Sequence, residues 1–174
     1  MPDRLPIFVN PEHAAIRGFR TSGRLMLQNM ARLQDRLLAP YGEVEVDLVF
    51  GKQGRRMYLA GTLSGWAALQ CQRCLQKMTM DIATEFRLGF VFSEAEIDGL
   101  LPGEEPLLID ADNKDALRLA SVIEDELELL LPMVIKHPEG QCQSGAEPAQ
   151  ETAKKELKTS RKNPFDVLVD LKKH

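Results

Sequence analysis

The fold is decided by the stretch EVEVDLVF at residues 43–50, in which apolar side chains recur at every second position. A repeat of two residues places alternate side chains on opposite faces of a strand, so this stretch predicts a strand with one buried face. The sequence GKQG at 51–54 then predicts a turn, and Met57–Leu63 predicts the second strand of a hairpin. The fold therefore begins from an antiparallel pair.

The alternation continues toward the C-terminus. Residues 65–70 predict another strand, which leads into Cys71. After Cys74, the apolar positions again recur every second residue, at Met78, Met80, Ile82, Phe86, Leu88, Phe90 and Phe92. Residues 94–103 are acidic and irregular and predict a loop, and residues 107–109 predict a short strand. We expect a meandering, mostly antiparallel sheet.

The N-terminal part predicts helices. Residues 5–9 predict a short strand, after which Asn10 caps and Pro11 opens a helix that runs through Arg20. Residues 21–23 break that helix. A second helix is expected over residues 25–38 and ends at Pro40 and Gly42, because its apolar residues have helical spacing: Leu25, Met26, Met30, Leu33, Leu37 and Leu38.

An acidic helix is expected from a cap at Asp115 to about Leu131, before Pro132. One face is apolar and is formed by Ala116, Leu119, Ala120, Ile123, Leu127 and Leu130. The other face carries Glu124, Asp125 and Glu128, which we interpret as a solvated or partner-binding surface. Consecutive helical residues such as 124–126 point in different directions, which disfavours a shared acid–base site. The whole pattern predicts an α+β domain over 1–137, with N-terminal helices and one acidic helix packed on the sheet.

The remaining sequence predicts a tail. Residues 138–162 contain few large apolar side chains and predict a mobile linker. Residues 163–174 form an amphipathic docking segment, which opens with Asn163, Pro164 and Phe165. Basic residues that could contact RNA phosphates, or simply be solvated, occur within the linker: Lys154, Lys155, Lys158, Arg161 and Lys162.

Bulk properties suggest a cytoplasmic protein. The N-terminal sequence lacks the features of a signal peptide, and no apolar run is long enough to span a membrane. The net charge is −4, but fourteen acids against three bases give residues 81–130 a charge of −11 between two basic ends. Such asymmetry is compatible with an interaction surface, although solubility alone could also produce it. No motif indicates a nucleotide or another small-molecule substrate.

The sharpest chemical motif is the sequence CQRC at 71–74. A gap of two residues lets one turn aim both sulfurs at a tetrahedral metal, and His137 with Cys142 offers a second ligand pair for structural Zn²⁺. Sixty-two residues separate the two pairs, so only the fold could bring them together. Metal-free thiols and a redox pair remain alternatives. A redox pair of the thioredoxin type is disfavoured by the position between two strands, although Arg73 would lower the pKa of a neighbouring thiol.

Several stretches carry a resemblance to a known family. LQCQRC at 69–74, EDELELLLPMVIKH at 124–137 with Cys142, NPFDVLVDLKK at 163–173 and the opening LPIFVNPEHAA resemble the YceD family of large ribosomal RNA subunit accumulation proteins. The resemblance implies a bacterial cytosolic protein needed for the synthesis, processing or stability of large-subunit RNA. It implies no catalytic residue.

Three functional hypotheses follow. The first is a non-catalytic ribosome-biogenesis factor that binds large-subunit (23S) ribosomal RNA or a ribosomal or assembly protein. The acidic helix would suit a basic protein better than RNA, because RNA is a polyanion. The second is an RNA-processing enzyme, and the third is a thiol redox or regulatory protein acting through Cys71 and Cys74.

Overall fold

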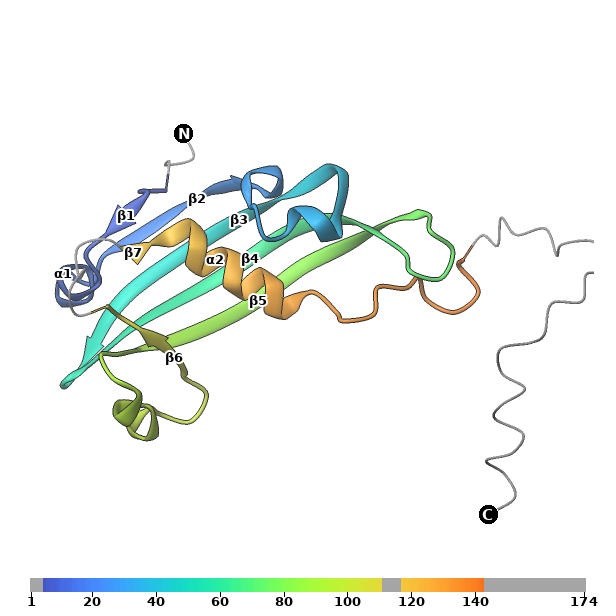
Figure 1. Ribbon diagram of the computed structural model, residues 1–174. Helices are drawn as coiled ribbons and strands as arrows, with labels where there is room; N and C mark the ends of the chain where they lie inside the picture. Colours follow the sequence, from blue (N-terminus) through green and yellow to red (C-terminus); the bar gives the residue numbers. More distant parts are fainter. Residues whose placement is uncertain (1–4, 111–116, 143–174) are drawn as a thin grey trace, which may run out of the picture. The chain divides into compact units, whose positions relative to one another are not determined.

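A five-stranded sheet forms the centre of the fold in the computed structural model, which describes residues 5–110 and 117–142 (Figure 1). Its strands run in the order β2 (Arg20–Met26), β3 (Leu37–Gln53), β4 (Arg56–Gln70), β5 (Lys77–Val91) and β6 (Glu105–Leu108). The first four strands form an antiparallel meander, whereas β6 pairs parallel to β5 at the edge. The expected α+β class and mostly antiparallel sheet are confirmed. A second, two-stranded sheet joins β1 (Phe8–Val9) to β7 (Leu117–Arg118).

One face of the sheet lines the hydrophobic core, as the repeat of two residues predicts. Val44, Val46, Leu48 and Phe50 of β3 are at most 1% exposed. Between them, Glu45 and Asp47 point to the other face and are exposed. Burial of alternate side chains is thus what gives this strand its orientation.

The two strands expected at 57–63 and 65–70 are a single strand, β4. Gly65 does not interrupt it, because Gly65 remains paired with Val44 on one side and Ile82 on the other. A Cβ atom at Gly65 would lie 2.2 Å from the backbone oxygen of Glu43. The glycine is therefore explained by close approach of two strands rather than by a turn.

The first helix, α1 (Pro11–Arg17), begins as predicted. The side chain of Asn10 accepts a hydrogen bond of 2.8 Å from the backbone N–H of His13, and Pro11 occupies the first turn. The helix ends before the expected Arg20, because Gly18 adopts the left-handed conformation with φ of 61°.

The helix expected over 25–38 was a wrong prediction. Residues 21–23, expected to be a break, lie in β2, and this strand continues to Met26. Two short 3₁₀ helices follow, η1 (Leu27–Asn29) and η2 (Gln34–Arg36), and β3 begins at Leu37. Leu27, Met30, Leu33 and Leu37 are all buried, at intervals of three or four residues. Irregular 3₁₀ turns satisfy this spacing as well as an α-helix does.

The expected end of that helix is also inside β3. Pro40, after a cis peptide bond, and Gly42 fall where the pairing of β3 with β4 shifts register. On the C-terminal side, the expected loop at 94–103 contains η3 (Glu94–Gly99), and the strand expected at 107–109 is β6.

The acidic helix is α2 (Leu119–Leu130), which lies across one face of the sheet (Figure 1). It starts later than predicted, because residues 117 and 118 belong to β7, and Asp115 and Ala116 lie outside the described residues. Its buried residues are Leu119, Val122, Ile123 and Leu127, and they belong to the same core as the sheet. In the part of the chain that the structure describes, no helix combines the length and apolar character needed to cross a membrane.

Candidate metal centre

The Cys71–Cys74 motif forms the turn between β4 and β5, as the sequence predicts. The backbone N–H of Cys71 donates to the oxygen of Gln76 at 2.9 Å, and the N–H of Leu75 donates to the oxygen of Cys71 at 2.8 Å. Leu75 takes the left-handed conformation, with φ of 60°. These bonds close a tight loop that turns both sulfur atoms toward the same side.

The second ligand pair arrives on the segment that follows α2. The helix stops before Pro132, whose oxygen accepts a 2.8 Å hydrogen bond from Arg36. Further along, the buried residue Ile135 accepts a 2.8 Å hydrogen bond from the backbone N–H of Gln72. This contact joins the segment to the β4–β5 turn and brings His137 and Cys142 beside the two cysteines.

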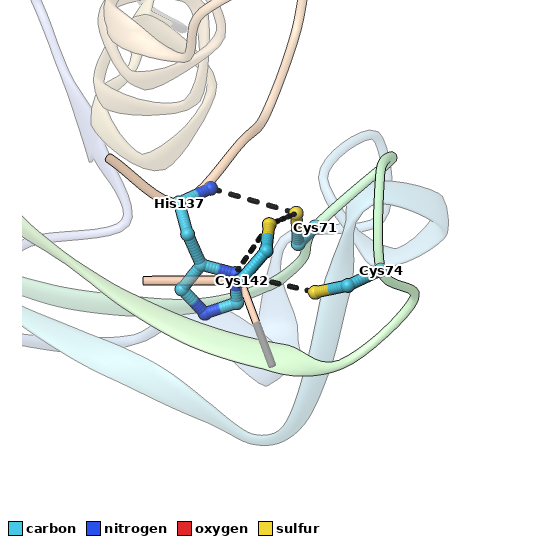
Figure 2. A group of neighbouring side chains, drawn as sticks. All are labelled: Cys71, Cys74, His137 and Cys142. Carbon is cyan, nitrogen blue, oxygen red and sulfur yellow. Dashed lines mark hydrogen bonds between the residues drawn. The ribbon is translucent and has the colours of Figure 1, made fainter. Parts of the chain in front are cut away.

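All four predicted ligands come together (Figure 2). Their donor atoms lie within 4.8 Å of one another. The sulfurs of Cys71 and Cys142 are 3.6 Å apart, and Nδ1 of His137 lies 3.4 Å from the sulfur of Cys74 and 3.7 Å from that of Cys142.

These three separations are close to the edge lengths expected for a tetrahedral metal site. Metal–sulfur bonds of about 2.3 Å and metal–nitrogen bonds of about 2.0–2.1 Å give sulfur–sulfur edges of roughly 3.8 Å and sulfur–nitrogen edges of roughly 3.6 Å. A disulfide, at about 2.05 Å, is much shorter than the observed sulfur–sulfur distance. The cluster can therefore hold a metal ion, with His137 binding through Nδ1 and carrying its proton on Nε2.

The surroundings of Cys71 favour the thiolate that a metal requires. Burial raises the pKa of this thiol, but backbone N–H groups of Cys74, His137 and Arg73 stabilise the anion, and the pKa falls to about 5. The pKa of the Cys74 thiol shifts in the opposite direction, upward. An N–H from Gln76 lowers its pKa, but burial and the neighbouring sulfurs outweigh it and raise the pKa. A bound cation would favour deprotonation of both thiols.

The sequence predicts that the charge of Arg73 lowers the pKa of a neighbouring thiol, but its backbone and its side chain act on different cysteines. Its backbone N–H helps to lower the pKa of Cys71, whereas its side chain points to Cys142. The Nε–H donates to that sulfur at 3.0 Å, and this bond raises the pKa of the guanidinium. The arginine thereby places a positive charge beside a group of three cysteines.

Comparison with known proteins assigns the chain to a family. The sequence model of the family described as "Large ribosomal RNA subunit accumulation protein YceD" matches residues 59–172, which include all four clustered residues and α2. The chain belongs to the YceD family. It is also 27% identical, over 97% of both chains, to the Haemophilus influenzae protein named "Large ribosomal RNA subunit accumulation protein YceD". No solved structure matches it.

In this YceD family member, the acidic residues of α2 have an internal partner that the sequence did not reveal. Arg32, between η1 and η2, places its Nε 3.4 Å from Glu124 and 3.7 Å from Glu128, and its Nη1 contacts Asp125. Its backbone N–H also donates to Glu124 at 2.7 Å. The three acids thus anchor the segment before β3 to α2, and their role in binding a partner stays a prediction.

The other predicted binding residues lie outside the described residues. These are the docking residues Asn163, Pro164 and Phe165, and the basic residues Lys154, Lys155, Lys158, Arg161 and Lys162. Of the expected linker, residues 138–142 are described, and they carry Cys142 into the cluster.

Proposed function

We propose that this YceD family member is a non-catalytic ribosome-biogenesis factor, which supports the synthesis, processing or stability of 23S ribosomal RNA. It would act by binding RNA or a ribosomal or assembly protein. The family description and the relative of the same name, aligned over 97% of both chains, support the link to large-subunit ribosomal RNA.

We further propose that Cys71, Cys74, His137 and Cys142 hold a structural Zn²⁺ ion. The observation that supports this most is that four protein donors lie within 4.8 Å of one another, with separations of 3.4 to 3.7 Å that suit a tetrahedral zinc site. Catalytic zinc sites keep one position open for water or substrate, whereas structural sites are closed by four protein ligands. The metal would therefore brace the fold.

The same geometry weakens the two alternatives. A closed ligand set leaves no metal position for an RNA phosphate, which disfavours metal-assisted processing at this site. A redox function would use Cys71 as its low-pKa thiolate, yet this side chain is fully buried at a hairpin turn, and reactive cysteines require access.

The biological proposal is tested in a strain that lacks the gene. The ratio of 23S to 16S RNA should fall and should recover when the wild-type gene is restored. An unchanged ratio would refute the proposal. Separately, purified protein should leave ribosomal RNA precursors intact across a range of divalent metals, and specific processing would show that the protein is an enzyme.

The metal proposal is tested by elemental analysis of the purified protein. We expect one zinc per wild-type chain and loss of zinc in Cys74→Ser. Gln72→Ala is a matched control in the same turn, because its side chain is exposed and only its backbone contacts Ile135. Wild-type protein without metal, or equal zinc in both variants, would contradict the assignment.

A further inference from the structure

Among residues 5–110 and 117–142, nothing covers the middle of the sheet face opposite the core. Across β2–β5, every second side chain points away from the core. From the row of the Ser22–Asp47 pair to the row of the Met26–Glu43 pair, most of these side chains are exposed. The segment after η3 approaches this side only farther along β5, where Glu104 binds Arg87. We call the uncovered region the open face. The buried hydrophobic residues of α1, η1 and α2 all belong to the core on the opposite side, whereas η2 and η3 bury none.

The open face is strongly acidic. Its carboxylates are Glu43, Glu45 and Asp47 on β3 and Asp81 and Glu85 on β5. Arg24 is the cation among them, and Arg20 and Arg87 lie in the next row of the same face. Asp47 and Glu85 flank Thr62 in one row across the sheet, about 10 Å apart at the usual strand spacing. Within the described residues, Asp47, Asp81 and Glu85 form no ion pair. Such a surface repels RNA phosphates and attracts cations.

A guanidinium group of the chain itself, that of Arg24, already pairs with two carboxylates of this face. Arg24 donates to Glu45 at 2.6 Å and lies 3.6 Å from Glu43. The two carboxylates are two residues apart on β3 and therefore project from the same side. Alternate residues of an extended peptide have the same repeat, about 6.8 Å, so a basic segment lying along the strand can meet successive carboxylates.

An aromatic side chain adds a second kind of contact. Trp66, partly exposed, is paired with Glu43 on one side and Asp81 on the other. Arginine side chains stack on tryptophan rings, and adjacent carboxylates strengthen the attraction for the cation. The combination of acids, small hydroxyl residues and one indole suits an arginine-containing peptide better than an apolar helix.

We propose that the open face docks an extended, basic segment of a partner protein. This inference rests on the proposed function, which leaves RNA and protein open as partners, and it specifies a protein. The negative charge of the open face favours a basic partner, and the repeat of the strand favours an extended conformation of the bound segment.

Trp66 provides a direct assay, because it is the only tryptophan of the chain. Full-length protein is titrated with a peptide of alternating arginine and serine while Trp66 fluorescence is followed. We expect a saturable change that weakens as salt rises, and no change with a glutamate–serine peptide or single-stranded RNA. A change with RNA but none with the basic peptide would overturn the proposal.

A pair of charge-matched variants locates the binding site. The variant Asp47→Asn/Asp81→Asn/Glu85→Gln removes three charges from the open face and should weaken peptide binding by about tenfold, since exposed ion pairs contribute modestly. The control Asp35→Asn/Glu94→Gln/Asp98→Asn removes three exposed charges elsewhere and should bind as the wild type does. Equal affinities of the two variants would refute docking on this face. Matching unfolding curves verify that both variants fold.

Returning both variants to the deletion strain separates this inference from the proposed function. We expect only the open-face variant to fail to restore the 23S RNA ratio. If both variants restore it and bind the peptide equally, docking on the open face is wrong while the ribosomal function stands. If the deletion itself leaves the ratio unchanged, the proposed function fails whatever the titrations show.

Discussion

Substitution of Arg32 by alanine tests whether the acids of α2 stabilise the fold. The guanidinium lies near Glu124, Asp125 and Glu128, and its Nη2 donates to the oxygen of Ser121 at 3.0 Å. The variant would leave three carboxylates on one side of α2 without this cation. It would also loosen the segment between η1 and η2 from the helix.

The expected loss of stability in Arg32→Ala follows from how exposed the ion-paired side chains are. The Arg32 side chain is 44% exposed, so each ion pair is expected to contribute about 0.2–1 kcal/mol. Glu124 is only 12% exposed, which places its pair toward the upper value. Allowing for shared geometry, Arg32→Ala should lower the free energy of unfolding by about 1–2 kcal/mol, or roughly 3–6 °C in Tm for a chain of this size.

Urea unfolding at low and high salt measures this change. Lys52→Ala is the control, because it removes one exposed cation that has no ion pair among the described residues. The difference between Arg32→Ala and Lys52→Ala should shrink as salt rises. A double-mutant cycle with Asp125→Asn should give a coupling energy of about 0.5 kcal/mol or more. Equal stability of the two alanine variants, or zero coupling, would show that the cluster contributes nothing.

Four further predictions concern the core, one titrating group and the metal. Ile123→Ala should cost about 2–5 kcal/mol, whereas Leu129→Ala on the same helix, 74% exposed, should change stability by less than about 0.5 kcal/mol in urea unfolding. Burial and neighbouring carboxylates raise the pKa of Glu126 to about 7, so the folded state binds an extra proton and stability falls as pH rises from about 4.5 to 7. Glu126→Gln should abolish that fall and, after a discount for solvent screening, gain about 1 kcal/mol at pH 8 but nothing at pH 4. Arg73→Ala should weaken zinc affinity about 10–100-fold in a chelator competition, and unchanged affinity would exclude a role for its charge. Chelation should speed trypsin cleavage after Lys136 more than cleavage within β3–β5, and equal rates would contradict a local metal brace.

The sheet could be predicted from the sequence wherever a single physical pattern controls burial. In residues 43–50 and 78–92, a period of two matches a sheet with one covered face, and the structure confirms strands in both. The helix prediction for residues 25–38 was wrong because the spacing of their buried side chains fits several local conformations. What decides between them is long-range pairing, such as Leu25 with Val44, which no local pattern reveals.

The ligand set was predictable by residue type, but its assembly was not. Cys71 and Cys74 are close in any conformation, whereas His137 lies 63 positions after Cys74 and meets it only through the folded segment that follows α2. The partner of the acidic helix was missed for the same reason. Arg32 precedes Asp125 by 93 positions, and nothing nearby in the sequence marks them as a pair.

The segment from residue 131 to residue 142 shows why a metal brace suits this fold. Ordering twelve residues costs about 12–24 kcal/mol in backbone entropy. Only Leu131 and Ile135 are buried apolar residues there, and they contribute about 3–6 kcal/mol. The hydrogen bonds from Gln72 and Arg36 add about 1–3 kcal/mol. About 3–20 kcal/mol of the ordering cost remains, and structural zinc, at about 10–16 kcal/mol in small zinc-finger peptides, is of the same order. The metal would therefore hold this segment on the β4–β5 turn, while the surfaces that remain open are left to bind the partner.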